Sequence, residues 1–349
     1  MTLAPELMSG GLPIDYDYVF PERPADPEMR ESASIWLFEE NGAFGFPRVG
    51  VEAEAHSWDE NRLYHANFAL AGGRALHDTG RAQAPSAVAE DGRPRILGAG
   101  PLSFRCVEPF RKWRVSFEGT AADSHVRDLV RGGKYQGCPR APVKFDVEIE
   151  MVTPAWVHDN PPEKLAKLSP QEAEEAGYMG IGWRCEHMFR GEGEFTLDGQ
   201  TRAFKALGTR VHRQSVRPLG GFRGHTWQSA VFPDGRGFGY IAYPPNEDGS
   251  PSFNDGYVFE NGRMYKAKAV KVPWLRRLIG EGDDVALELE YEGGVARIEG
   301  ATALTTFRVG NPEIGGLNLQ QGGARYVWDG QTAFGMIERS AHESQTSLG

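Results

Sequence analysis

The chain has 349 residues, of which 40% are hydrophobic and 25% charged, and its formal net charge is −10. These fractions are typical of a soluble globular protein, and the length suits two domains or one large all-β assembly. The acidic balance, without a long basic run, argues against nucleic acid or an anionic membrane as the main partner.

The first twenty residues lack the positive segment and apolar run of a signal peptide, and no stretch approaches the ~18 apolar residues of a membrane span. The three cysteines, Cys106, Cys138 and Cys185, are odd in number and widely spaced. This pattern favours reduced thiols over a disulfide framework, and buried side chains over nucleophiles. We therefore expect a cytoplasmic protein.

The first half of the chain is predicted to be an arm followed by short strands. Residues 1–33 are rich in Pro, Asp and Glu without periodicity, which predicts an irregular arm packed on the first domain. β-Prone runs begin at SIWLFEE (34–40) and continue to KFDVEIEMVTP (144–154). In the last run, apolar residues from Phe145 alternate strictly with charged residues from Lys144, which predicts a strand with one wet face.

One segment, SPQEAEEAGY (169–178), is predicted to be helical. Ser169 suits the N-cap, Pro170 the first helical position, Glu172 the capping box and Gly177 the stop. Because β-prone runs lie on both sides, we interpret this helix as the connection between two β-rich halves.

Turn signals recur in the second half at intervals typical of a β-meander. They are Asp198-Gly199, Asp234-Gly235, Asn261-Gly262, Gly293-Gly294 and Asp329-Gly330. Five hairpins supply enough strands to close a barrel. The run VPWLRRLIGEG (272–282) suits a short helix or an interrupting loop.

Five blocks carry a resemblance to a known group. They are CVEPFRKWRVSFEG (106–119), EHMFRGEGEFTLDG (186–199), GTRVHRQSVRP (208–218), GHTWQSAVFPDGRGFGY (224–240) and YVWDGQTAFGMIERS (326–340). In this order they resemble the hydroxyneurosporene synthase (carotenoid 1,2-hydratase) and AttH-like superfamily. The resemblance implies two lipocalin-like β-barrels side by side, and a group that includes hydratases and cyclases working without an organic cofactor. In one departure, Val211 stands where an acidic residue is expected beside His212.

The predicted fold is therefore all-β, with two lipocalin-like antiparallel barrels and one short linking helix. The expected divisions are an arm at 1–33, a first barrel at 34–168, the helix at 169–178 and a second barrel at 179–349.

The stretch 206–227 concentrates the first candidates for catalysis. Arg210 and His212 share one face of a strand by the two-residue period. A histidine suits proton transfer near neutral pH, and the arginine could hold an oxyanion. The alternative is an ion-pair cluster at a domain interface. His225 also shares a face with Trp227, which could form a flat wall for a ligand; the alternative is a core tryptophan beside an exposed histidine.

Glu186 is a further catalytic candidate, because apolar neighbours would raise the proton affinity of its carboxylate. Its alternative role is an ion pair with Arg184, and Glu338 beside Arg339 has the same two interpretations. Side chains that could bind substrate complete the set: Trp227, His56, Trp58, Tyr64, Tyr240 and Tyr326.

Motifs for metals and cofactors are absent from the sequence. It contains no CxxC, HExxH or EF-hand loop, and no Walker A, GxSxG or dinucleotide-binding GxGxxG pattern. His212 and His225 lack a third ligand at a fixed spacing. We expect neither a metal nor a cofactor.

The sequence thus predicts a cofactor-independent acid–base enzyme acting on a largely apolar small molecule, such as a terpenoid, a steroid or a lignin-type aromatic. Lyase, hydratase and isomerase chemistry all suit such a site. The alternative is a non-catalytic lipocalin-like carrier of an apolar ligand. An enzyme needs two or more converging titratable groups, whereas a carrier needs one orienting group. We expect no nucleic acid and no membrane span; homo-oligomer formation stays open.

Overall fold

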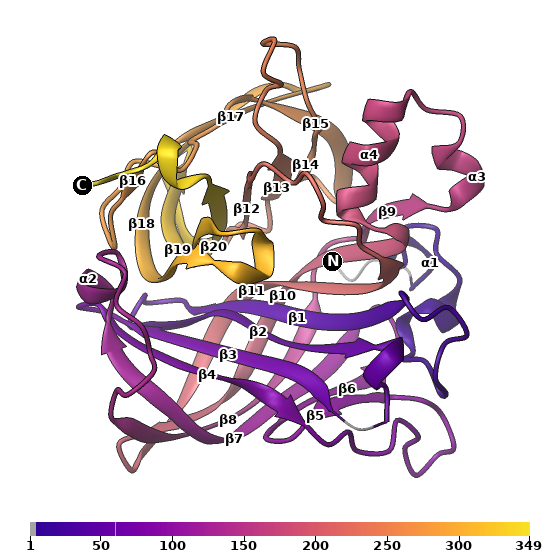
Figure 1. The fold of residues 1–349 in the computed structure, drawn as a ribbon, viewed down its shortest axis with the longest axis vertical. Helices are drawn as coiled ribbons and strands as arrows, with labels where there is room; N and C mark the ends of the chain where they lie inside the picture. Colours follow the sequence, from indigo (N-terminus) through magenta and orange to yellow (C-terminus); the bar gives the residue numbers. More distant parts are fainter. Residues whose placement is uncertain (1–4, 60) are drawn as a thin grey trace.

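The two halves of the chain form antiparallel β-barrels that lie side by side (Figure 1). The computed structural model describes residues 5–59 and 61–349. The predicted all-β fold with two lipocalin-like barrels is confirmed. No helix among the described residues is long and apolar enough to cross a membrane.

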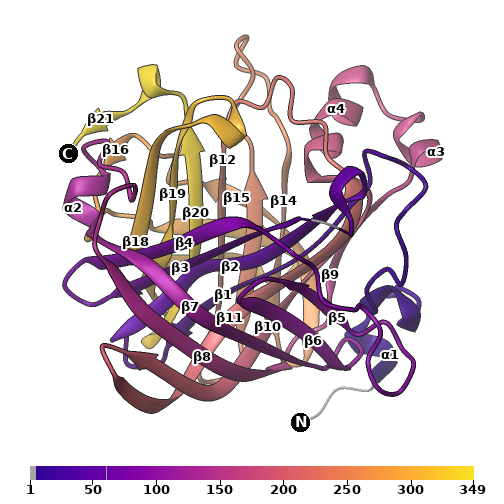
Figure 2. The same ribbon diagram turned by 60° about the horizontal axis from the view of Figure 1, so that its bottom comes forward.

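Eight strands close the first barrel, in the order β4-β3-β2-β1-β11-β10-β8-β7, because β4 pairs back to β7. Two strands extend the sheet beyond β7, and β9 pairs with β10 (Figure 2). The strands are β1 (Arg30–Glu39), β2 (Phe44–Glu54), β3 (Arg62–Leu70), β4 (Arg74–Ala82), β5 (Ile96–Ala99), β6 (Leu102–Glu108), β7 (Lys112–His125), β8 (Arg140–Met151), β9 (Trp156–Asn160), β10 (Ile181–Leu197) and β11 (Gln200–Val216).

The second barrel is a closed meander whose strands follow chain order. Its turns include the predicted Asn261-Gly262 and Asp329-Gly330 pairs, and all four residues have φ between 47° and 77°. The strands are β12 (His225–Val231), β13 (Gly237–Ala242), β14 (Asn254–Glu260), β15 (Arg263–Lys271), β17 (Leu287–Tyr291), β18 (Gly294–Asn311), β19 (Leu317–Trp328) and β20 (Gln331–Ala341). Two short strands, β16 (Arg277–Leu278) and β21 (Ser347–Leu348), pair beside it, so residues 272–282 form a loop with one short strand.

Helical segments are short and lie outside the barrels. The predicted helix is α4 (Pro170–Met179), where Ser169 and Glu172 form the expected capping box. The helix passes Gly177 and ends at Gly180, which has a φ of 125°. The others are α1 (Pro5–Met8), η1 (Ile14–Asp17), η2 (Ala55–Ser57), α2 (Val126–Leu129), α3 (Pro162–Leu165), η3 (Pro312–Ile314) and η4 (Glu343–Gln345).

The boundary expected between the barrels is wrong. Strands β10 and β11 pair with β8 and β1, so the first barrel extends to Val216. Helix α4 connects β9 to β10, which pair with each other, and is therefore an excursion from one sheet. The chain crosses to the second barrel between Val216 and His225. The expected arm ends earlier than residue 33, since β1 begins at Arg30.

Packed side chains fill the interior of both barrels. In the first, β8 turns Phe145 and its apolar neighbours inward, as predicted, and the Phe145 ring packs in a tilted arrangement against Phe46, with ring centroids 4.7 Å apart. In the second, Gln228 bridges the hydroxyl groups of Tyr240, at 2.5 Å, and Tyr326, at 2.9 Å. A ligand site is therefore to be sought outside the barrel interiors.

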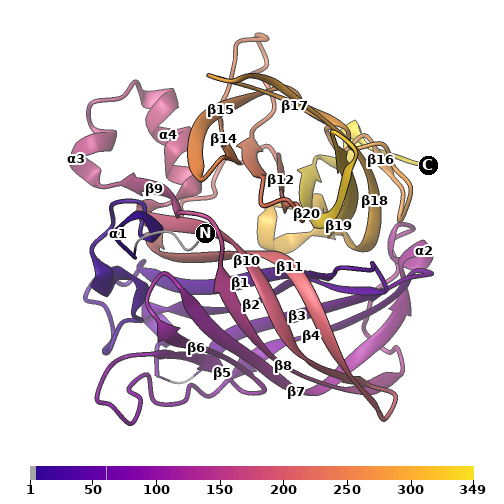
Figure 3. The same cartoon turned by 180° about the vertical axis from the view of Figure 1, so that it is seen from behind.

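The barrels meet through their outer faces, with β10 and β11 running beneath the second barrel (Figure 3). Thr209 of β11 and Ser229 of β12 share a hydrogen bond of 2.6 Å at this interface. Asn67 of β3 donates to Gln321 of β19 at 3.2 Å. These buried contacts fix the position of the first barrel's outer face relative to that of the second barrel.

Candidate functional site

A cavity of about 110 Å³ lies between the barrels. Strands β1, β2, β10 and β11 form one wall, and β12, β13, β19 and β20 contribute to the other. A cavity of ~150 Å³ holds benzene, so a ligand larger than one small ring must extend through the opening. The lining residues are Arg30, Ser32, Ser34, Trp36, Arg48, Glu52, Met179, Arg184, Val211, Arg213, Arg217, Leu219, Phe222, His225, Trp227, Ile241, Tyr243, Arg308, Asn311, Glu313, Ile314, Leu319 and Glu338.

Strand alternation decides which side chains of the first barrel reach this cavity. On β11, Val211 and Arg213 line it, whereas Arg210 and His212 point into the barrel interior. The same period on β1 turns every second residue from Ser32 to Trp36 towards the cavity.

The second barrel presents a histidine and a carboxylate side by side. On β12 and β20, His225 is the direct partner of Ser340, and Trp227 is the direct partner of Glu338. His225 and Trp227 share a face, as their spacing predicts, and both line the cavity. The alternative of an exposed histidine is wrong, because His225 is 7% exposed.

Both ring nitrogens of His225 have partners. Nδ1 lies 2.7 Å from Ser340 Oγ, which also accepts the backbone N–H of His225 at 3.2 Å. Nε2 lies 3.2 Å from Glu338 Oε1. Since Ser340 Oγ already accepts a hydrogen bond from the His225 backbone, its own hydroxyl can donate to Nδ1. We infer that neutral His225 carries its proton on Nε2, directed at Glu338.

Glu338 is an anion at neutral pH. Burial alone would raise its pKa, but the hydrogen bond and charge of His225, the charge of Arg48 and a hydrogen bond from Gln321 hold the pKa at about 2. A carboxylate next to an imidazole stabilises the protonated ring and fixes its orientation. The pair is therefore suited to accept and return a proton.

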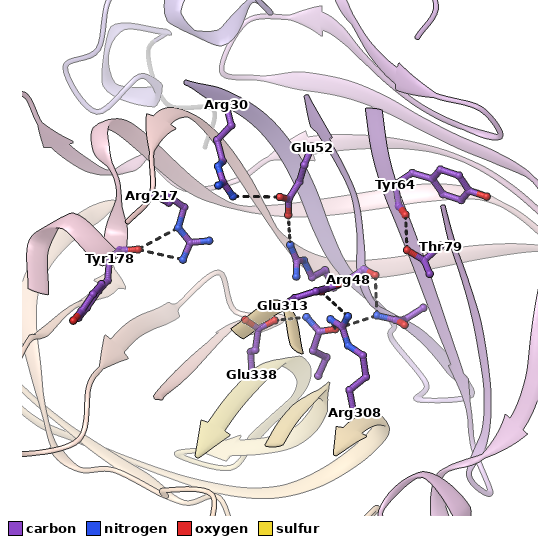
Figure 4. Close-up of polar contacts among 12 residues, drawn as sticks. Arg30, Arg48, Glu52, Tyr64, Thr79, Tyr178, Arg217, Arg308, Glu313 and Glu338 are labelled. Atoms are coloured by element: carbon purple, nitrogen blue, oxygen red, sulfur yellow. Dashed lines mark hydrogen bonds and ion pairs between the residues drawn. The ribbon is translucent and has the colours of Figure 1, made fainter. Parts of the chain in front are cut away.

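An ion-pair group of the first barrel faces Glu338 (Figure 4). Glu52 lies 2.7 Å from Arg48 and 3.7 Å from Arg30. Burial acts to raise the pKa of Glu52, yet neighbouring cations, Arg48 foremost, hold it at about 2. Arg217 donates from two nitrogens to the carbonyl of Tyr178, at 3.1 and 3.2 Å.

Glu186 forms the ion pair that was its alternative interpretation. Its Oε2 accepts from Arg184 Nη2 at 2.7 Å, and neither side chain is more than 2% exposed. Burial raises the pKa of Glu186 in spite of Arg184. Arg184 lines the cavity, with its guanidinium 5.0 Å from the Trp227 ring, whereas Glu186, on the same face of β10, is not among the lining residues.

Tyr243 adds a phenol to the second wall. Its hydroxyl has no hydrogen-bond partner among the described residues, and the residue lines the cavity. Burial raises the pKa of Tyr243, although the charges of Arg217, Arg184 and Arg213 oppose this. The hydroxyl therefore stays protonated and is available as a donor to a ligand.

The structure does not bring His212 and Arg210 to the cavity. Both are fully buried inside the first barrel with Asp17 of the arm, which lies 2.5 Å from Arg210 and 3.3 Å from His212. Glu31 accepts from the other ring nitrogen of His212 at 2.9 Å. The acid that Val211 does not supply thus comes from two residues nearly two hundred positions away. The cluster matches the ion-pair alternative, placed in a core and not at a domain interface.

Five of the six substrate-binding candidates also lie away from the cavity. Tyr240 and Tyr326 are fully buried inside the second barrel. Trp58 packs in the first core against Phe20, and Tyr64 bonds to Asp78. The side chain of His56 is 61% exposed on η2. Only Trp227 of that set lines the cavity.

Sequence reasoning missed Arg213, Tyr243 and Glu52 as site residues, and it weighed Glu338 without selecting it. The two-residue period of a strand offered one signal for Arg213. Arg213 lies on the opposite face of the strand from Arg210 and His212, so it faces outward when they face the barrel interior. The sequence around β11 does not show that the second barrel covers this outward face. In the part of the chain that the structure describes, no group of three or more His, Cys, Asp or Glu side chains could hold a metal ion.

Comparisons with known proteins agree with this architecture. Residues 19–343 match the family described as "Domain of unknown function (DUF7064)". No curated protein sequence matches the chain. An AttH-like protein from Nitrosomonas europaea has a similar structure, with a TM-score of 0.56 at 14% identity over 93% of this chain and 99% of that one.

Two further solved structures are similar. One is CghA with Sch210972, with a TM-score of 0.51 at 11% identity over 90% of this chain and 89% of that one. The other is kievitone hydratase from Nectria haematococca, with a TM-score of 0.50 at 10% identity over 93% and 94%. The AttH-like fold indicated by the sequence is confirmed, and the narrower likeness to hydroxyneurosporene synthase stays a prediction.

Proposed function

Because the chain belongs to the DUF7064 family, a family of unknown function, we propose its activity from the geometry of its cleft. The proposal is a cofactor-independent enzyme that moves protons on a small molecule bound between the barrels. Lyase, hydratase and isomerase reactions share this requirement, since each adds or removes a proton beside a carbon centre.

The observation that carries the proposal is the His225–Glu338 pair in the cavity wall. The two side chains are 3.2 Å apart, and each has a further partner that fixes its orientation. His225 exchanges the proton in this scheme, and Glu338 stabilises the imidazolium that forms. General acid–base catalysis by one positioned side chain contributes about 10²- to 10⁴-fold to a rate.

Tyr243 supplies the second titratable group that an acid–base enzyme needs. Tyr243 comes two residues after Ile241, and Ile241 pairs directly with Trp227. The three side chains therefore share one wall of the cavity. In the proposed reaction its phenol donates a hydrogen bond or a proton to the ligand while His225 accepts one. Apolar surface from Trp36 and Trp227, with ring centroids 4.7 Å apart, contacts the body of the ligand.

Two of the similar structures support this class of activity. One is kievitone hydratase, and another was solved with a small molecule, Sch210972. The carrier alternative is less well supported, because the barrel interiors that would serve as a ligand calyx are filled by Phe46, Phe145, Gln228 and their neighbours.

Untargeted metabolite comparison tests the proposal. An extract of the source cells is incubated with wild-type protein, with His225→Gln and with His56→Gln, whose side chain is 61% exposed outside the cavity. We expect a compound that wild type and His56→Gln consume and that His225→Gln consumes at least about a hundredfold more slowly. Equal consumption by all three would exclude His225 as the proton-transfer group. A compound that is retained unchanged by the protein would identify a carrier.

A further inference from the structure

A row of charged side chains crosses the first-barrel wall of the cavity. Glu52, Ser32, Arg213 and Arg184 are direct cross-strand neighbours on β2, β1, β11 and β10. Arg213 and Arg184 thus stand opposite each other, and direct partners have Cβ atoms only about 4.5–5.5 Å apart. Like charges in that position destabilise a sheet, so the row needs a compensating negative charge.

The described residues compensate the two other charged members of this row and leave Arg213 without a partner. Arg184 pairs with Glu186, and Glu52 pairs with Arg48 and Arg30. Arg213 makes no ion pair within 4.0 Å, and its Nη1 is buried without a hydrogen-bond partner in the described part of the chain. Arg30 Nε is likewise buried and unpartnered there.

The excess of positive charge is local to the cavity. Among the residues that the structure describes, six arginines and three glutamates line it, although the whole chain has a net charge of −10. Burial, together with Arg217 and Arg184, lowers the pKa of Arg213 well below its usual value. Arg213 is partly buried. An unpaired charge that is withdrawn from water is destabilising, and a protein tolerates it most readily where a ligand supplies the counter-charge.

We propose that Arg213, flanked by Arg30 and Arg217, binds an oxyanion of the substrate, so that the substrate is an amphipathic organic acid. A guanidinium offers paired donors that match a carboxylate. The acid group would occupy the basic wall while the apolar part contacts Trp36 and Trp227. This inference rests on the proposed function, because it takes the cleft to be the substrate site, and it replaces a largely apolar substrate by one with a charged end.

Binding of matched acids and amides tests the inference. Benzoate and hexanoate are titrated into wild-type protein beside benzamide and hexanamide, with calorimetry and thermal melting as the measurements. We expect the acids to bind and to raise the melting temperature, with an affinity that falls as salt is added. The amides, which lack the charge, should bind at least about tenfold more weakly.

Variants of Arg213 assign the effect to this site. Arg213→Met should weaken benzoate binding about tenfold or more. The unliganded variant should melt at the same or a higher temperature, since an unpaired buried charge is replaced by an apolar side chain. Arg213→Lys should retain part of the binding. The matched control is Arg297→Met, because the Arg297 side chain is 71% exposed on β18 and is not among the residues that line the cavity.

The outcomes separate this inference from the proposed function. Benzoate binding that Arg213→Met leaves unchanged, or equal binding of acids and amides, would overturn the anion site even if His225 proves catalytic. Arg213-dependent binding in a protein without turnover would uphold the anion site and remove the enzymatic proposal.

Discussion

Two buried histidines of this molecule have similar polar neighbours but differ in their access to a ligand. His212 in the first barrel lies between Asp17 and Glu31, and His225 in the cleft lies between Ser340 and Glu338. His212 is completely buried among core side chains, whereas His225 borders a cavity. The comparison shows that access to a ligand, more than the composition of a polar cluster, separates a candidate catalytic group from a structural one.

The interior cluster is best explained as an anchor for the arm. Burial acts against the charges, but Arg210 and His212 still hold the pKa of Asp17 well below its usual value. Hydrogen bonds to Asp17 and Glu31 raise the pKa of His212, although burial lowers it. Asp17 also accepts from the indole of Trp113 at 2.9 Å. These contacts tie η1 to strands β7 and β11 of the first barrel.

The largest expected effect comes from breaking this interior cluster. Asp17→Asn removes the negative charge that compensates Arg210 and His212 while it preserves the side-chain shape. Removing one partner of a buried ion pair costs about 3–5 kcal/mol, and we expect a loss of that size in the free energy of unfolding. Chemical denaturation of wild type and variant at pH 7 measures it.

The matched control is Asp15→Asn, two residues earlier on the same short helix. Asp15 is exposed, so its substitution should change the free energy of unfolding by less than about 0.5 kcal/mol. If both variants lost the same small amount, the interior cluster would not anchor the arm.

A smaller effect is expected from the cleft pair. At pH 7, Glu338→Gln removes charge-assisted hydrogen bonds to His225 and Gln321 and should cost about 1.5–3 kcal/mol. The folded-state pKa of Glu338, about 2, lies below its ordinary value of 4.5. The stability that Glu338 contributes is therefore present above pH 4.5 and is lost as the pH falls from 4.5 towards 2.

Denaturation curves recorded from pH 7 down to pH 2 measure this loss. The curves of wild type and Glu338→Gln should converge on acidification, because only the wild type has this carboxylate to protonate. Glu343→Gln, an exposed substitution, should follow the wild type throughout. Parallel curves for wild type and Glu338→Gln would show that Glu338 is not held as an anion by its neighbours.

Local patterns in the sequence predicted the parts of the fold that depend on local physics. The Asp329-Gly330 and Asn261-Gly262 turns need positive φ, and the Ser169–Glu172 capping box spans only four residues. Side-chain alternation correctly put Arg210 with His212, and His225 with Trp227, because the period of a strand is two. Each of these features depends on residues that are close in the sequence.

Long-range pairing could not be predicted in the same way. Nothing near β11 shows that its partner is β1, about 180 residues earlier, and the domain boundary was misplaced for this reason. The same limit hid Asp17 as the partner of His212 and Arg213 as a residue of the cleft. A strand reveals which residues share a face, but the face that becomes core and the face that becomes a site are decided by distant segments.

The smallest expected effect concerns the outward face of β11, where the two barrels touch. Thr209 and Ser229 share one buried hydrogen bond of 2.6 Å. Thr209→Val or Ser229→Ala alone leaves a buried hydroxyl without its partner. Such a loss lowers the free energy of unfolding by about 1–3 kcal/mol, and we expect a value near the lower limit because a hydroxyl is a small group. The double variant should be nearly neutral relative to the worse single variant, since no orphaned hydroxyl remains. A double-mutant cycle by chemical denaturation measures the coupling. Strictly additive losses would mean that the hydroxyl groups do not depend on each other, and that apolar packing alone holds the second barrel against the wall that carries Arg213.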